Sequence, residues 1–157
     1  LHRRRHSFPT RRSSDLYLAD QHLVAEHKEI LQLCGSYRMS KRSKKGIDFK
    51  NLPKNFTLNE GHVKFFYDKF AYLHKRFLEV QNEMRRRKIK TNRVMNCEEF
   101  EIDGVYRNWE PSQSDIHLIC NRIQERIEEK PEWYRYGDKR YIDTNYYTLF
   151  QHRIFVE

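Results

Sequence analysis

The sequence has little glycine, proline or cysteine and contains no long apolar run. Five Gly and four Pro among 157 residues are too few for the closely spaced turns of a β-sandwich. The three cysteines, Cys34, Cys97 and Cys120, are odd in number and far apart, which favours reduced thiols in a cytosolic protein. No segment approaches the roughly 18 apolar residues of a membrane span, so we expect no membrane partner.

Acidic residues are outnumbered, and aromatic residues are plentiful. Lys and Arg number 31 against 22 Asp and Glu, a formal charge of +9, which favours a polyanionic partner. Phe, Trp and Tyr make up 14% of the chain, so one domain can bury a core despite its high charge.

Residues 1–16 differ from the rest in character. The stretch from His6 to Leu16 resembles one reading frame of a common short-read sequencing adapter, and Arg3–Arg5 would occupy an index barcode. We interpret residues 1–16 as a non-native adapter translation; the alternative is a natural basic arm that binds phosphate. Without this segment the chain keeps 26 basic and 21 acidic residues, so much of the positive charge lies in doubtful sequence.

Hydrophobic periodicity predicts an all-α fold, a single compact domain of three main helices with long irregular connections. The first helix covers about residues 20–35, with Gly35 as its C-terminal stop, and a basic loop follows from Arg38 to Lys50.

The second helix carries the clearest periodicity and should be the central packing element. We expect it to begin at a capping box formed by Thr57 and Glu60 and to end at the basic cluster 85–88. Its apolar stripe recurs at intervals of three and four: Val63, Phe66, Phe70, Leu73, Phe77, Val80 and Met84.

The third helix begins near Ser112 and is closed by Pro131. Arg122 and Arg126 are adjacent on the face opposite its isoleucines. Residues 89–108 should form an irregular connection. The domain should cover 17–140, and the extension 141–157 is compatible with a strand, a short helix or a frayed end.

One group of residues in the first helix could support chemistry. His22, Glu26 and Glu29 stand at i, i+4 and i+7, on one face and away from the apolar stripe. The spacing allows a carboxylate for acid–base work or three metal ligands. It is most typical of an ordinary solvated helix face, so the pattern alone does not decide.

Three segments carry a family resemblance. They are LADQHLVAEHKE at 18–29, GHVKFFYDK at 61–69 and PEWYRY at 131–136. In this order and spacing they resemble the phage endonuclease V type of pyrimidine-dimer DNA glycosylase, over about residues 18–140. The resemblance implies an all-helical, monomeric enzyme in the cytoplasm of a bacterial or phage-infected cell. Its partner would be double-stranded DNA with damaged bases, and it would need no metal or cofactor.

The resemblance also implies a mechanism. Such enzymes are DNA glycosylases and abasic-site lyases. The free α-amine of an N-terminal Thr attacks C1′ at the 5′ base of a cyclobutane pyrimidine dimer, and the resulting imine undergoes β-elimination. An α-amine has a pKa near 7.7–8.0, so an appreciable fraction is neutral at working pH. A neighbouring carboxylate can stabilise the sugar cation and shuttle protons.

Several residues inherit roles from this resemblance. Glu29 falls on the catalytic Glu, and Gln21 and His22 fall on residues that face the lesion. Lys28 replaces an Arg, which keeps the charge but loses bidentate phosphate geometry. His62 matches a His at the start of the family's second helix, and we expect a role in the site and a role in the structure equally.

Other predicted contacts lie toward the C-terminus. Arg122 and Arg126 fall on a basic pair that holds phosphates. Trp133, Tyr134 and Tyr136 either stack on DNA or fill the core, and Trp133 is the favoured core residue.

The nucleophile is the departure from the family pattern. It should lie 21 residues before Glu29, where this sequence has Phe8, while Thr10 is internal. We therefore expect the chain to bind damaged or abasic DNA but to form no imine at that position. The alternatives are a non-catalytic helical nucleic-acid-binding protein and a metal-dependent enzyme.

Overall fold

A computed structural model describes residues 17–58 and 61–156 of the chain, and it confirms the all-α fold. The helices are α1 (Asp20–Arg42), α2 (His62–Phe65), α3 (Phe70–Arg86), α4 (Glu98–Ile102), α5 (Gln113–Glu129) and α6 (Asn145–Val156). Three 3₁₀ segments join them: η2 (Phe49–Asn51), η3 (Phe66–Asp68) and η4 (Tyr141–Asp143). A short antiparallel hairpin is formed by β1 (Arg135–Tyr136) and β2 (Lys139–Arg140).

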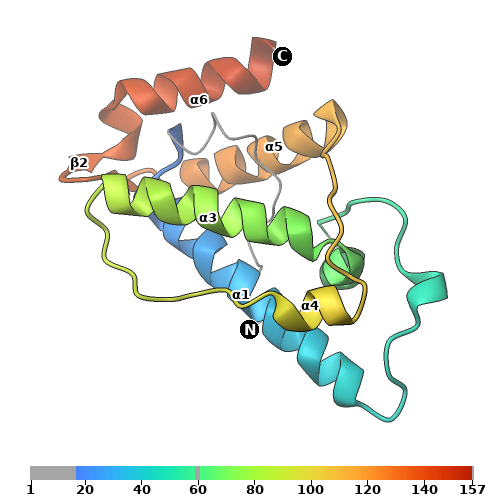
Figure 1. Ribbon diagram of the computed structural model, residues 1–157. Helices are drawn as coiled ribbons and strands as arrows, with labels where there is room; N and C mark the ends of the chain where they lie inside the picture. Colours follow the sequence, from blue (N-terminus) through green and yellow to red (C-terminus); the bar gives the residue numbers. More distant parts are fainter. Residues whose placement is uncertain (1–16, 59–60, 157) are drawn as a thin grey trace.

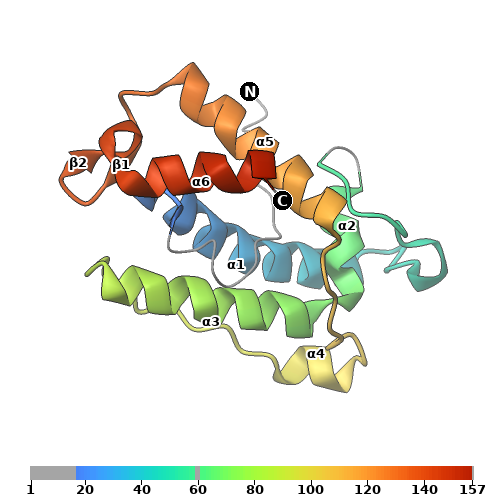
Figure 2. The same ribbon diagram turned by 90° about the horizontal axis from the view of Figure 1, so that it is seen from above.

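Helix α1 lies between the other main helices. It runs beside α3 on one side, while α5 lies on its other side and packs against α6 (Figures 1 and 2). Within the described residues, none of the helices combines the length and apolar character that a membrane crossing requires.

Helix α1 is longer than predicted, and the stop at Gly35 is wrong. The helix continues to Arg42, so the first part of the expected basic loop is helical. Beyond Gly35, the hydroxyl of Tyr37 donates to Asp103 at 2.8 Å, and Arg38 Nε donates to Glu99 at 2.7 Å. These contacts with the α4 region offset the roughly 1 kcal/mol that a helical glycine costs.

The second predicted helix is interrupted. Helix α2 begins at His62, after Gly61 in the left-handed region at φ 85°, where a Cβ would lie 3.0 Å from Pro53 Cγ. The start at Thr57 is therefore wrong, and Glu60 lies outside the described residues. Helix α3 begins anew at Phe70, whose N–H donates to the Val105 carbonyl, so the connection 89–108 supplies an acceptor for its first turn.

The apolar stripe and the start of the third helix are confirmed, whereas the connection 89–108 is not wholly irregular. The apolar stripe of the second helix is buried except for the half-buried Val63. Ser112 caps α5, and its hydroxyl and backbone exchange hydrogen bonds with Asp115. The connection 89–108 contains the short helix α4. The extension 141–157 forms η4 and α6 and contributes Phe150 to the core.

A buried ion pair joins α1 to α3. The guanidinium of Arg76 is 2% exposed and donates from Nε and Nη2 to Glu26 Oε1 at 2.9 and 2.7 Å. Its Nη1 reaches Glu79 at 3.0 Å. Water does not solvate the buried guanidinium or the Glu26 carboxylate, so each charge is stabilised mainly by the opposite charge.

Replacing Arg76 should therefore destabilise the protein strongly. Arg76→Ala leaves the Glu26 carboxylate buried without its main partner, and we expect a loss of about 3–5 kcal/mol in the free energy of unfolding. Urea unfolding followed by circular dichroism measures it. The matched control is Lys75→Ala, an exposed neighbour on the same helix, which should cost less than about 0.5 kcal/mol. Equal losses in both variants would contradict the prediction.

His27 should make stability depend on pH. Its buried ring stacks on Phe77 with centroids 4.6 Å apart, and Gln81 Nε2 donates to its Nε2 at 3.4 Å. Burial, with a smaller effect from Arg93, lowers the pKa of His27. The unfolded chain then binds more protons below about pH 6.5, so the free energy of unfolding falls as the pH drops.

The test compares the protein with His27→Phe, which keeps an aromatic ring against Phe77. Between about pH 7.5 and 5.5 the unmodified protein should lose more stability than the variant, because only it has His27 to protonate on unfolding. Urea unfolding at each pH gives both slopes. Parallel slopes would show that His27 contributes nothing.

Candidate active site

The interpretation of His22, Glu26 and Glu29 as a solvated face of α1 is wrong for two of the three residues. His22 and Glu26 are buried, and Glu29 is half-buried. The three side chains lie within about 60° of arc on the helix. Helix α1 is covered both by α3 and by the segment around Tyr134, so its buried arc is wider than its apolar stripe.

His22 is held by an aromatic stack. Its ring lies parallel to that of buried Tyr134, with centroids 4.6 Å apart and planes 4° apart. Burial raises the pKa of Tyr134, while the charge of Arg126 opposes that rise. Arg126, from α5, therefore lies within electrostatic reach of the stack. The N-terminal half of α1 and the segment 133–136 therefore meet at this stack.

Gln21 fastens the segment 133–136 to α1. Its Nε2 donates to the Trp133 carbonyl at 2.7 Å, and its Oε1 accepts from the Arg135 N–H at 2.9 Å. The carboxylate of Asp20 accepts from the Gly137 N–H at 2.8 Å. The first turn of α1 thus fixes the backbone of residues 133–137, and we call residues 133–136 the aromatic segment.

The three aromatic residues of this segment have different environments. Trp133 is 57% exposed, so its favoured core placement is wrong, and Tyr134 takes the buried position instead. Tyr136 is half-buried and stacks on Tyr146 of α6, with centroids 4.0 Å apart. Trp133 ends a turn in which its N–H donates to the Lys130 carbonyl, and the chain becomes extended only at β1, after the buried Tyr134.

The environment of Tyr136 contains residues that the sequence did not single out. Its hydroxyl accepts from Arg86 Nη2 at 2.9 Å, and the guanidinium carbon of Arg87 lies 4.0 Å from its ring centroid. Arg86 and Arg87 belong to the predicted basic cluster 85–88, but their sequence gives no sign that they bind a tyrosine fifty positions away.

The other predicted site residues are distributed along α1, α2 and α5. Lys28 is exposed, beside Glu29, whose Oε2 is shielded from solvent. Arg122 is half-buried, and its Nη1 lies 3.9 Å from Glu125. His62 is buried and bonds the Thr57 carbonyl through Nδ1 at 2.9 Å, which supports its structural role.

Metal ligation was one alternative for His22, Glu26 and Glu29. In the part of the chain that the structure describes, no group of three or more His, Cys, Asp or Glu side chains could hold a metal ion. Glu26 is instead bound to Arg76.

A family model described as pyrimidine dimer DNA glycosylase matches residues 4–96, more than half of the chain. The chain belongs to the pyrimidine dimer DNA glycosylase family. The resemblance inferred from the sequence is thus confirmed. The match includes α1, α2 and α3, and hence Glu29. In this glycosylase, α5 and the segment 133–136 lie beyond the match. Residues 1–16 lie outside the described residues, and their adapter origin stays a prediction.

Proposed function

We propose that this glycosylase acts on cyclobutane pyrimidine dimers in double-stranded DNA and also cleaves the resulting abasic strand as a lyase. The observation that carries the proposal is the position of Glu29 in a chain of this family. Glu29 shares one edge of α1 with His22, whose stack on Tyr134 lies within reach of Arg126. The Glu29 carboxylate therefore lies about two turns along the same helix face from the contact between His22 and Tyr134.

Glu29 is the catalytic carboxylate in this proposal. A neutral amine attacks C1′ of the damaged nucleotide, the base departs, and an imine forms. The carboxylate stabilises the positive charge that develops on the sugar and then moves the proton lost in β-elimination. Its half-buried position strengthens that electrostatic effect, because water screens it less.

The surrounding residues hold the DNA. Lys28, Arg122 and Arg126 bind backbone phosphates, which gives affinity but no sequence preference. Gln21, His22, Tyr134 and Tyr136 shape and support the lesion-facing surface, and His62 supports it from α2. A base must leave the stack for C1′ to be reached, which costs less at a distorted lesion than in regular duplex.

The nucleophilic amine is the part of the family mechanism that this chain lacks at the expected position. The family's nucleophile would stand at Phe8, whose nitrogen lies in a peptide bond when residues 1–7 precede it. We propose that this form binds damaged or abasic DNA and forms no imine at position 8.

Borohydride trapping on abasic-site DNA tests the nucleophile. A second form carries Phe8→Thr behind a specific protease site, so that the whole chain folds before the cut frees the amine of residue 8. We expect the cut Phe8→Thr form to give a strong adduct at residue 8. The full chain should give none there, and peptide mass spectrometry will assign any weak adduct to Leu1 or a lysine. If the cut form binds abasic-site DNA and gives no adduct, residue 8 of this chain is not the position of the nucleophile.

Glu29→Gln in the cut Phe8→Thr form tests the carboxylate. The amide keeps the shape of the side chain but neither carries the charge nor accepts the proton, so strand cleavage should fall about 10²- to 10⁴-fold. Binding to DNA with an uncleavable abasic analogue should be retained. The matched control is Glu98→Gln, an exposed carboxylate on α4, which should cleave normally. Full cleavage by Glu29→Gln would show that the assignment is wrong.

A further inference from the structure

A basic loop follows the C-terminal end of α1. It covers residues 43–54, and both views show it projecting beyond the ends of the main helices (Figures 1 and 2). The loop contains four lysines, and Asp48 is its only acidic residue. We call Lys44, Lys45, Lys50 and Lys54 the loop lysines, and all four are exposed. The loop therefore presents a strongly positive surface to solvent.

The charge of the loop lysines is not matched within the described part of the protein. None of them forms an ion pair with a described residue. Lys41 differs, because its Nζ lies 2.6 Å from Asp103 and its charge suits the negative end of α1. Asp48 accepts from Asn51 Nδ2 at 2.7 Å. The loop lysines lie beyond the helix, so neither Asp103 nor the end of α1 accounts for them.

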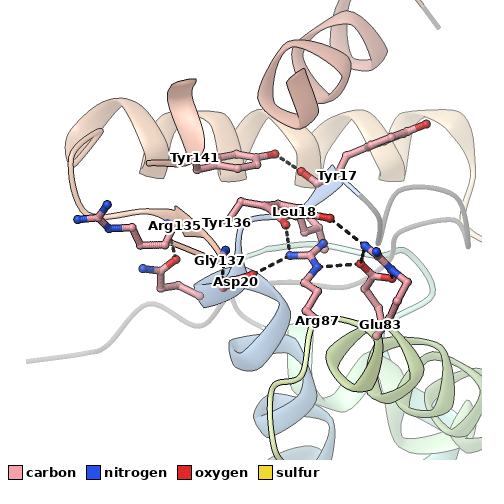
Figure 3. Close-up of polar contacts among 11 residues, drawn as sticks. Tyr17, Leu18, Asp20, Glu83, Arg87, Arg135, Tyr136, Gly137 and Tyr141 are labelled. Atoms are coloured by element: carbon pink, nitrogen blue, oxygen red, sulfur yellow. Dashed lines mark hydrogen bonds and ion pairs between the residues drawn. The ribbon is translucent and has the colours of Figure 1, made fainter. Parts of the chain in front are cut away.

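The basic cluster 85–88 shows the contrasting case. Arg87 bonds Glu83 and Asp20 at 2.7 and 3.0 Å (Figure 3), and its side chain is only 5% exposed. Arg86 bonds Glu83 at 2.6 Å. The positive charge of these two guanidinium groups is thus matched by carboxylates of the protein, whereas that of the loop lysines is available to an external anion.

The backbone of the loop is held in one path. Ser43 Oγ donates to the Ser40 carbonyl at 2.7 Å, and the Gly46 N–H donates to the Ser43 carbonyl at 3.0 Å. Ile47 and Leu52 are half-buried against the core. A loop that is already fixed loses little entropy when it binds a partner.

An exposed strip of α1 leads from the candidate site to this loop. Lys28, Gln32 and Met39 are exposed and lie within about 40° of arc on the helix. Arg42, at the end of α1, is exposed as well. The helical rise places Arg42 about 20 Å beyond Glu29. Since successive base pairs of B-DNA lie about 3.4 Å apart, this distance corresponds to about six base pairs.

We propose that the loop lysines bind backbone phosphates of the duplex about six base pairs to one side of the damaged nucleotide. This inference rests on the proposed function and deepens it, because it assigns a second DNA contact to the same complex. Lysines that neutralise phosphates release counterions, which adds affinity without reading sequence or damage. Neutralising the loop should therefore weaken binding to damaged and undamaged duplexes by the same factor.

The experiment measures the affinity of the full chain for short duplexes by fluorescence anisotropy, at about 0.1 M salt. The loop variant combines Lys44→Gln, Lys45→Gln and Lys50→Gln. On a duplex with an uncleavable abasic analogue and about twelve base pairs on each side, it should bind about 10- to 100-fold more weakly. The slope of log K against log salt should become shallower by about two to three, one unit for each lost phosphate contact.

Shortened duplexes test where the loop binds. Two further duplexes keep about four base pairs on one side of the analogue or on the other, too few to reach the loop about six base pairs away. One of them should cost the unmodified chain about as much affinity as the loop variant loses. The same shortening should cost the loop variant less than about twofold, because the lysines and the phosphates form one contact. Additive losses would overturn the inference.

Two control variants separate phosphate contacts from a general effect of charge. The first keeps the charge of the loop and should bind within about threefold of the unmodified chain. It combines Lys44→Arg, Lys45→Arg and Lys50→Arg. The second removes the same net charge from exposed positions outside the loop, and its affinity should also fall less than about threefold. It combines Lys75→Gln, Lys88→Gln and Lys90→Gln. Equal losses in this control and the loop variant would refute the contact.

The outcomes distinguish this inference from the proposed function. If the unmodified chain prefers the abasic analogue to undamaged duplex and the loop variant binds equally tightly, the loop contact is refuted while the proposed function stands. A loss confined to damaged DNA would also refute it, because the lysines would then act at the lesion. If the unmodified chain binds neither duplex, the proposed function fails, and the inference fails with it.

Discussion

The buried pair between Arg76 and Glu26 fixes how α1 is rotated about its axis, and the candidate site depends on that rotation. Because the Glu26 carboxylate must meet the guanidinium of α3, the residues on either side of it along the helix are placed as well. His22 is turned toward Tyr134, and Glu29 comes to the edge of the buried arc. A rotation of one residue position, about 100°, would remove Glu29 from this edge altogether.

A second polar network, at the start of α1, sets where other chain segments meet the helix. Arg87 connects Glu83, Asp20 and the Leu18 carbonyl, while Gln21 connects to the backbone of 133–135. The buried pair thus sets the rotation of α1, and this second, partly exposed network sets its N-terminal surroundings. Both use arginines from α3 or its end, so this helix supports the site without contributing a predicted catalytic residue.

Local patterns predicted the helices well and the burial of polar residues poorly. The stripe from Phe66 to Met84 and the cap at Ser112 follow from 3.6-residue periodicity and local hydrogen bonds, which a sequence displays directly. Helix α1 passes through Gly35 because Arg38 meets Glu99, sixty-one positions away. Glu26 is buried because Arg76 lies fifty positions away. Neither partner can be found by looking along one helix, whereas the family resemblance led us to expect Glu29 as the catalytic carboxylate without reference to its burial.

The C-terminal helix changes what the aromatic segment can do. Tyr136 is enclosed by Tyr146, Arg86 and Arg87, and Tyr134 is stacked on His22. Both rings are therefore held by their neighbours, and Trp133 alone among the three presents most of its surface to solvent. Since Gln21 binds the Trp133 carbonyl, this exposed ring stands on a fixed backbone. A rigid aromatic surface loses little entropy when a base stacks on it, so under the proposed function this fixed backbone would favour binding of an unstacked nucleotide.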